Sequence, residues 1–141
     1  MHEVVRALLA ATALLSLSAC SPRPTEQTAV VKDGQWGKVY RGGYVEMVSV
    51  SGVQTQWRMH SALSIPAGEL SAWFYVYLCN ADPSNCVSIA QALVPFRAEA
   101  GHSYRARAQE QLNGSNRFWV WVEDEETGSA VSEKVLGVPG A

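Results

Sequence analysis

The histidines are the side chains in this sequence best suited to acid–base chemistry. The chain has three, and two of them, His60 and His102, lie beyond the N-terminal segment. A histidine acting as a general base needs an orienting acid and a group to activate. Ser103 follows His102, but neighbours on a strand point to opposite faces, and the sequence has neither a G-x-S-x-G nor an S-x-x-K motif. We therefore predict no catalytic residue and no enzymatic activity, with His102 opening a strand after a turn at Gly101.

Three consecutive carboxylates, Asp124, Glu125 and Glu126, offer the second chemical possibility. Carboxylate oxygens are the ligands that Ca²⁺ prefers, but an EF-hand loop alternates Asp and Asn with other residues, and this run does not. A charged hairpin tip that is simply solvated has the same composition. We predict that the run binds no metal, and no other part of the sequence suggests a cofactor.

The N-terminus has the composition of an export signal. A positive charge at Arg6 precedes residues 7–19, which are uncharged and rich in Ala and Leu. This apolar run is shorter than the roughly 20 residues that a membrane-spanning helix needs, but it suits the central region of a signal peptide. It ends in Leu17-Ser18-Ala19-Cys20, which resembles the lipobox of bacterial lipoproteins. The resemblance implies that residues 1–19 are removed and that Cys20 carries the lipid; the alternative is an ordinary signal peptide with a chance cysteine.

The residues after Cys20 imply a destination and a tether. Two or more acyl chains attach a protein durably to a membrane. Ser21 stands where Asp would retain a lipoprotein in the inner membrane of enteric bacteria, so the resemblance implies an outer-membrane protein facing the periplasm. The polar segment 20–33, with Pro22 and Pro24, predicts a flexible tether.

Once Cys20 is committed to lipid, Cys79 and Cys86 remain as an even pair. Such a pair in an oxidising compartment predicts a disulfide bond. Metal binding is the alternative, but two thiols without a nearby histidine do not complete a four-ligand zinc site.

The charge and length of the chain exclude some classes of protein. The net charge is −2, and it is unchanged when residues 1–19, with one acid and one base, are removed. A near-neutral domain with scattered charges lacks the basic surface that nucleic acid requires. Residues 34–141 suffice for one domain with a modest core.

This domain shows the period of β-strands and no sustained helical period. Strands are expected at Tyr44–Val50, Gln54–Leu63, Glu69–Cys79, Val87–Phe96, His102–Gln111, Arg117–Glu123 and Ala130–Val138. In the first of these, Val45 and Met47 should face one side, and Val48 and Val50 the other. Turns or loops are expected between the strands, at Ser51-Gly52, Ile65–Gly68, Asn80–Asn85, Ala98–Gly101, Asn113–Asn116 and Glu126–Gly128. We predict an all-β fold, a small antiparallel sandwich of about seven or eight strands.

Two segments carry partial family resemblances. Residues 49–52 followed by Leu63-Ser64-Ile65-Pro66-Ala67-Gly68-Glu69-Leu70 resemble PEGA-like repeats, with Glu69 in the place of their usual His and Ser51-Gly52 in the place of Asp-Gly. Residues 96–104, with Trp121-Val122-Glu123-Asp124 and Thr127-Gly128, resemble uncharacterised proteobacterial lipoproteins. Both resemblances imply a β-sandwich in an exported protein, and neither supplies a catalytic residue.

The aromatic residues are the candidate binding surface. Within Glu69–Cys79, alternation places Leu70, Ala72, Phe74, Val76 and Leu78 on one face. The other face of this strand holds Trp73, Tyr75 and Tyr77. Two later strands, His102–Gln111 and Arg117–Glu123, place on their corresponding faces Arg105, Arg107, Trp119 and Trp121. If these strands share a sheet, this second face is one surface of aromatic rings and guanidinium groups. The alternative is that the N-terminal residues Trp36, Val39 and Tyr40 cover the rings, or that the arginine stems lie along them.

Rigid aromatic rings beside arginines are typical of protein-binding hot spots. We therefore expect a non-enzymatic binding or structural module of the cell envelope that meets a protein partner. Binding of peptidoglycan or a surface polysaccharide, with Trp73, Tyr75 and Trp119 as stacking platforms, is the second hypothesis.

Overall fold

A computed structural model of the protein describes residues 22–36, 43–55, 62–79, 85–112, 115 and 117–139. The predicted lipidation site Cys20 lies outside these residues, as do His60, Val39 and Tyr40. Within the described part of the chain, no helix is long and apolar enough to span a membrane.

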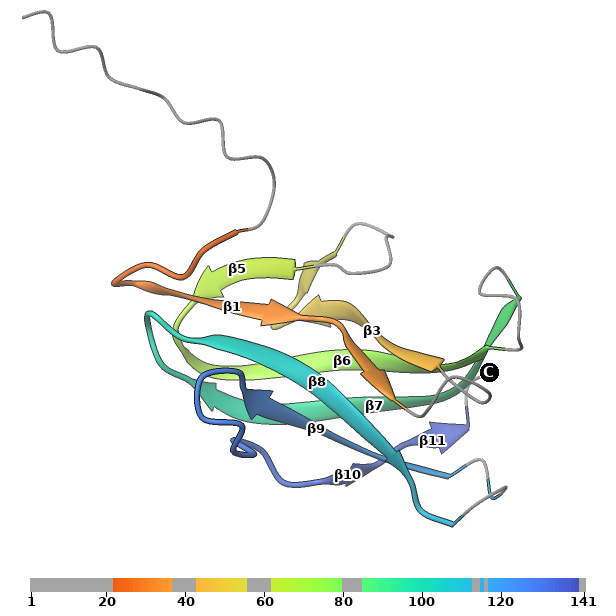
Figure 1. Ribbon diagram of the computed structural model, residues 1–141. Helices are drawn as coiled ribbons and strands as arrows, with labels where there is room; N and C mark the ends of the chain where they lie inside the picture. The colour runs from red at the N-terminus through yellow and green to blue at the C-terminus, as the bar shows by residue number, and fades with distance from the viewer. Residues whose placement is uncertain are drawn as a thin grey trace, which may run out of the picture.

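Two β-sheets pack face to face as a sandwich, which confirms the predicted fold class (Figure 1). The five-stranded sheet has the order β10 (Val135–Leu136), β9 (Phe118–Asp124), β8 (Ser103–Glu110), β1 (Thr28–Lys32) and β5 (Ala62–Pro66). The six-stranded sheet has the order β11 (Val138–Pro139), β7 (Cys86–Ala98), β6 (Gly68–Cys79), β3 (Gly43–Val50) and β2 (Gly34–Trp36), with β4 (Val53–Gln54) paired to β3. Neighbouring strands are antiparallel, except that β1 and β8 run parallel.

The β6–β7 hairpin forms the centre of the six-stranded sheet. The two strands pair continuously from Gly68 opposite Ala98 to Cys79 opposite Cys86, with one register shift. The predicted disulfide between Cys79 and Cys86 is confirmed. It links the two strands at the end of the hairpin where the chain passes from β6 to β7, and so limits fraying there.

The core lies between the sheets and follows the alternation of the sequence. Phe74 and Val76 of β6 are fully buried, as are Val120 and Val122 of β9. Tyr104 of β8 is also buried, and its ring contacts that of Phe96 with 5.7 Å between the centroids. The predicted core faces of these strands are confirmed, although Leu78, near the end of β6, is only half-buried.

One predicted face is wrong, at the end of β3. Met47 pairs with Phe74 and Ser49 pairs with Trp73, so Val48 is an extra residue without a partner on β6. A bulge of this kind shifts the side-chain alternation by one position. Val50, expected on the face opposite Val45 and Met47, is therefore fully buried in the core with them.

The predicted tether is too long, because its last part belongs to the domain. Residues 28–32 form β1, which lies between β8 and β5, and Ala29, Val30 and Val31 are completely buried. The chain then crosses to the other sheet at Asp33, whose buried carboxylate accepts a hydrogen bond of 2.7 Å from the backbone N–H of Met47. At Gly34 the chain passes so close to the backbone of Ala106 that a Cβ atom would overlap it.

The C-terminal segment also differs from the prediction of a single strand over Ala130–Val138. It is divided into β10, on the edge of the five-stranded sheet, and β11, on the edge of the six-stranded sheet. Gly137 lies between them, and its N–H donates a 2.8 Å hydrogen bond to the carbonyl of Phe118. Both ends of the described chain thus connect the two layers.

The remaining strand boundaries differ less from the predicted ones. Of the expected strand Gln54–Leu63, residues 56–61 lie outside the described part, and β4 and β5 occupy its ends. The expected turn Ile65–Gly68 is shorter, because β5 extends to Pro66 and β6 begins at Gly68. Pro66 is tolerated there because β5 is an edge strand.

Candidate functional site

The predicted aromatic and arginine face is divided between two surfaces. Trp73, Tyr75 and Tyr77 lie on β6, in the six-stranded sheet, whereas β8 and β9 belong to the five-stranded sheet. The condition for one continuous face, that these strands share a sheet, is therefore not met. The outer faces of a sandwich point away from each other, so the structure does not bring Trp73 together with Trp119 and Trp121.

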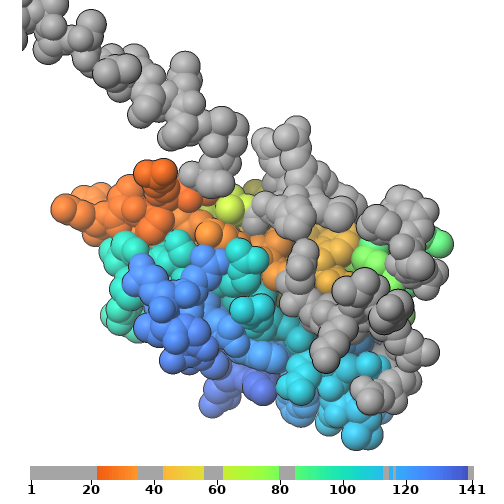
Figure 2. All heavy atoms as spheres, in the orientation of Figure 1, coloured from red at the N-terminus to blue at the C-terminus, as the bar shows by residue number. Residues whose placement is uncertain are grey.

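On the five-stranded sheet, shown from its outer side in Figure 2, the charged groups pair with one another. Arg107 donates to Glu123 at 2.9 Å, and the indole N–H of Trp121 donates to the same carboxylate at 3.0 Å. The ammonium group of Lys134 lies 4.4 Å from the centre of the Trp121 ring. The face of Trp121 is thus occupied by groups of the same chain.

Glu125 forms ion pairs with two further cations of this surface. Arg105 donates to one of its oxygens at 2.7 Å, and Lys32 to the other at 3.0 Å. Partial burial by itself would raise the pKa of Glu125, but the two cations outweigh it and hold the pKa below its ordinary value. Both arginines of the predicted binding face are thus paired with carboxylates of the same chain.

The six-stranded sheet presents a different outer face. We define the aromatic surface as Trp73, Tyr75 and Tyr77 of β6, with Tyr44 of β3 and Leu93 of β7. Trp73 is 42% exposed and Leu93 is 57% exposed, and the two are directly paired across the strands. One exposed ring beside an exposed aliphatic side chain on the neighbouring strand makes this the more suitable of the two faces for a partner.

The rings of the aromatic surface also order one another. Trp73 meets Tyr75 edge to face with 6.5 Å between the centroids, and Tyr44 stacks on Tyr77 at 4.6 Å. Burial raises the pKa of Tyr77, and a hydrogen bond to Glu46 raises it further. Burial and the same carboxylate raise the pKa of Tyr44. Both phenols therefore stay neutral at physiological pH.

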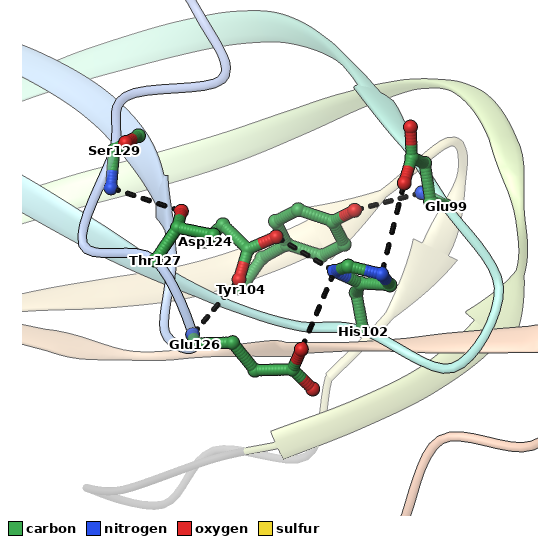
Figure 3. Close-up of polar contacts among 7 residues, drawn as sticks. All are labelled: Glu99, His102, Tyr104, Asp124, Glu126, Thr127 and Ser129. Atoms are coloured by element: carbon green, nitrogen blue, oxygen red, sulfur yellow. Dashed lines mark hydrogen bonds and ion pairs between the residues drawn. The ribbon is translucent and has the colours of Figure 1, made fainter.

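A second cluster of functional side chains lies at one end of the β8–β9 hairpin (Figure 3). The sequence places His102 directly before β8 and Asp124 at the end of β9, and antiparallel pairing brings these two ends together. Nδ1 of His102 lies 2.7 Å from Oδ2 of Asp124 and 3.9 Å from Oε2 of Glu126. Its other nitrogen, Nε2, lies 3.6 Å from Oε2 of Glu99. One imidazole thus faces three carboxylates.

The surroundings hold this cluster in place. Asp124 is only 5% exposed, and its second oxygen accepts the backbone N–H of Glu126 at 2.8 Å. The Tyr104 ring stacks beside the imidazole, while its hydroxyl accepts the N–H of Glu99 at 2.7 Å. The turn that leads to His102 uses Gly101 in the left-handed region, at φ 84°.

Sequence reasoning missed this arrangement because it compared His102 only with its neighbour Ser103. The prediction that His102 opens a strand was right to within one residue, since β8 begins at Ser103, but its acid comes from 22 residues further along the chain. One signal in the sequence could have found this pair. The expected strands His102–Gln111 and Arg117–Glu123 follow each other as a hairpin, and antiparallel pairing places the start of the first beside the end of the second, where Asp124 follows.

Charge at His102 should make stability depend on pH. A hydrogen bond to Asp124 is the main cause that raises the pKa of His102, and the carboxylates of Asp124, Glu126 and Glu99 add to it. Burial by itself would raise the pKa of Asp124, but the hydrogen bond and charge of His102, together with the backbone N–H groups of Glu126 and Thr127, outweigh burial and lower that pKa. Both partners are therefore charged, and the ion pair is fully formed, from the acid range up to about pH 6.5, which is the pKa of histidine in the unfolded chain.

In metal-free protein with EDTA, we expect the melting temperature to fall as the pH rises above about 6.5, through the folded pKa of His102. The reason is that the unfolded chain loses the imidazole proton at a lower pH than the folded protein does. Thermal denaturation followed by circular dichroism across this range measures the effect, and His102→Gln should remove the His102-dependent part of the slope. An unchanged slope in the variant would contradict the assignment.

Comparison of the chain with protein-family models, curated proteins and solved structures gives no match. The two partial resemblances described above therefore rest on the quoted residues alone.

Proposed function

We propose that the protein is a lipid-anchored component of the bacterial cell envelope, attached through Cys20 and facing the periplasm from the outer membrane. Its domain is a non-enzymatic binding module that meets a protein partner. The anchoring part rests on the lipobox-like Leu17-Ser18-Ala19-Cys20. The binding part rests on one observation, the exposed Trp73 beside the exposed Leu93 on the outer face of the six-stranded sheet.

The composition of the aromatic surface favours a protein over a glycan. The cross-strand partner of Trp73 on β7 is Leu93, and Pro95 and Val138 are exposed on the same face. An apolar neighbourhood of this kind suits the core of a protein interface, where aromatic rings are buried against another apolar surface. A sugar that stacks on Trp73 would instead use polar groups beside the ring to fix its hydroxyls, and Ser49, the partner of Trp73 on β3, is one such group.

Affinity purification from detergent-solubilised envelope tests both parts of the proposal with the full-length tagged protein. Wild-type protein should be found in the membrane fraction with its N-terminus acylated at Cys20, as mass spectrometry would show. Trp73→Ala should lose the partner, because truncation of a central aromatic residue typically costs about 2 kcal/mol or more of binding.

Trp121→Ala is the matched control, since this tryptophan lies on the opposite sheet and is covered by Lys134. It should retain the partner. Identical sets of co-purified proteins for wild type and Trp73→Ala would overturn the protein-binding proposal. A saturable change of tryptophan fluorescence with cell-wall fragments, absent from Trp73→Ala, would assign the surface to a glycan instead. An unacylated chain that begins at Met1 in the cytosol would overturn the anchoring.

A further inference from the structure

We infer that His102, Asp124 and Glu126 form a binding site for one divalent transition-metal ion, of which Zn²⁺ is the representative. The potential ligand atoms, one from each side chain, all lie within 4.8 Å of one another. The site is on the turns at one end of the β8–β9 hairpin, whereas the aromatic surface is on the outer face of the other sheet. The inference is therefore independent of the proposed protein partner.

The distances between the candidate ligand atoms suit an ion of the size of Zn²⁺. Metal–ligand bonds of about 2.0–2.2 Å place neighbouring ligand atoms of a tetrahedral zinc ion about 3.3 Å apart. Nδ1 of His102 is 2.7 Å from the Asp124 oxygen and 3.9 Å from the Glu126 oxygen, so the two separations bracket this value. The Glu126 side chain is 61% exposed and can rotate to close the longer one. Asp124 is fixed by its buried position, so the shorter separation widens by a small rotation of the His102 side chain, which is 29% exposed.

The far side of the imidazole provides a second observation. A histidine that binds a metal through one nitrogen commonly directs its other N–H to a carboxylate, which orients the ring and increases its basicity. Glu99 lies on this side of the ring, at an ion-pair distance of 3.6 Å from Nε2, and its 72% exposed side chain is free to approach to hydrogen-bond distance. A simple His–Asp ion pair would need neither Glu99 nor Glu126 beside the ring.

The charges of the cluster point the same way. Three carboxylates surround one imidazole, so even a protonated His102 leaves an excess of negative charge. The nearby cations Lys32 and Arg105 form their ion pairs with Glu125. A bound divalent cation would compensate most of the remaining charge, and it would replace the proton on Nδ1.

The ligand types select among cations. Imidazole nitrogen with carboxylate oxygen suits zinc and neighbouring transition metals, whereas Ca²⁺ takes six to eight oxygen ligands. Three protein ligands leave at least one position of a tetrahedral ion to water. We expect zinc to bind reversibly, and calcium much more weakly.

Isothermal titration calorimetry of the EDTA-treated, dialysed protein with ZnCl₂ tests the inference. Wild-type protein should bind one zinc ion and release protons from His102. Glu126→Gln should weaken binding at least tenfold, and it should leave the fold intact because this side chain is exposed. His102→Gln should weaken it further, and titration with CaCl₂ should show little binding.

Glu133→Gln, which removes an exposed carboxylate away from the cluster, and His60→Ala are the matched controls and should bind as wild type does. The inference is overturned if zinc does not bind at millimolar concentration, or if Glu126→Gln and His102→Gln bind it as tightly as wild type. Loss of binding in His60→Ala alone would place the ion elsewhere and also overturn it.

Discussion

A chain that begins at Gly34 should fail to fold, whereas one that begins at Pro22 should unfold cooperatively. Starting at Gly34 removes β1, the strand between β8 and β5. Ala29, Val30 and Val31 are completely buried, so their loss exposes the core and leaves β5 without a neighbour. Burial of the two valines alone contributes about 3–6 kcal/mol. A small domain has about 5–15 kcal/mol in total, so most of the stability should disappear.

Circular dichroism melts of the two chains measure this effect. A third chain that begins at Glu26 keeps β1 and serves as the control for shortening the N-terminus. It should melt close to the chain that begins at Pro22. A cooperative transition at the same temperature in the chain that begins at Gly34 would show that β1 contributes nothing to the fold.

Phe74→Ala should destabilise the domain by about 3–5 kcal/mol, the usual cost of removing a fully buried aromatic ring. Phe74 is 0% exposed and lies on β6 opposite Met47 and Ala92. The neighbouring Trp73→Ala should cost clearly less, because Trp73 is 42% exposed on the other side of the same strand.

Urea denaturation of both variants measures the difference from their midpoints, with similar slopes expected for a two-state transition. The pair is a sharp comparison because the two residues are adjacent and both aromatic. It also prepares the partner experiment, since Trp73→Ala must remain folded for its loss of binding to be interpreted. Equal destabilisation by the two substitutions would contradict the assignment of faces on β6.

The alternation of side chains was predictable where a strand pairs regularly. The buried Ala72, Phe74 and Val76 of β6 follow directly from the two-residue period. The prediction failed at Val50, because the bulge at Val48 depends on how β3 pairs with β6 and leaves no mark in the local pattern. It failed again for β1, where the prolines and polar residues before Thr28 obscure a short buried strand.

Of the candidate sites, too, only some features were predictable from the sequence. The disulfide followed from the number of cysteines, and the outward position of Trp73 followed from alternation. The ion pair between His102 and Asp124 did not, because its partners come from the two ends of a hairpin. The separation of Trp73 from Trp119 and Trp121 did not either, because strands of similar composition joined different sheets.

By itself, the sequence determined that the protein is all-β, which side of most strands is apolar, and which cysteines pair. These properties depend on residue types a few positions apart, because a pleated strand alternates its side chains whatever its neighbours are. Only the tertiary structure decided which strands share a sheet, that β1 runs parallel to β8, and that three carboxylates gather around His102. Such properties arise from contacts between distant segments, and many sheet arrangements are compatible with the same local pattern.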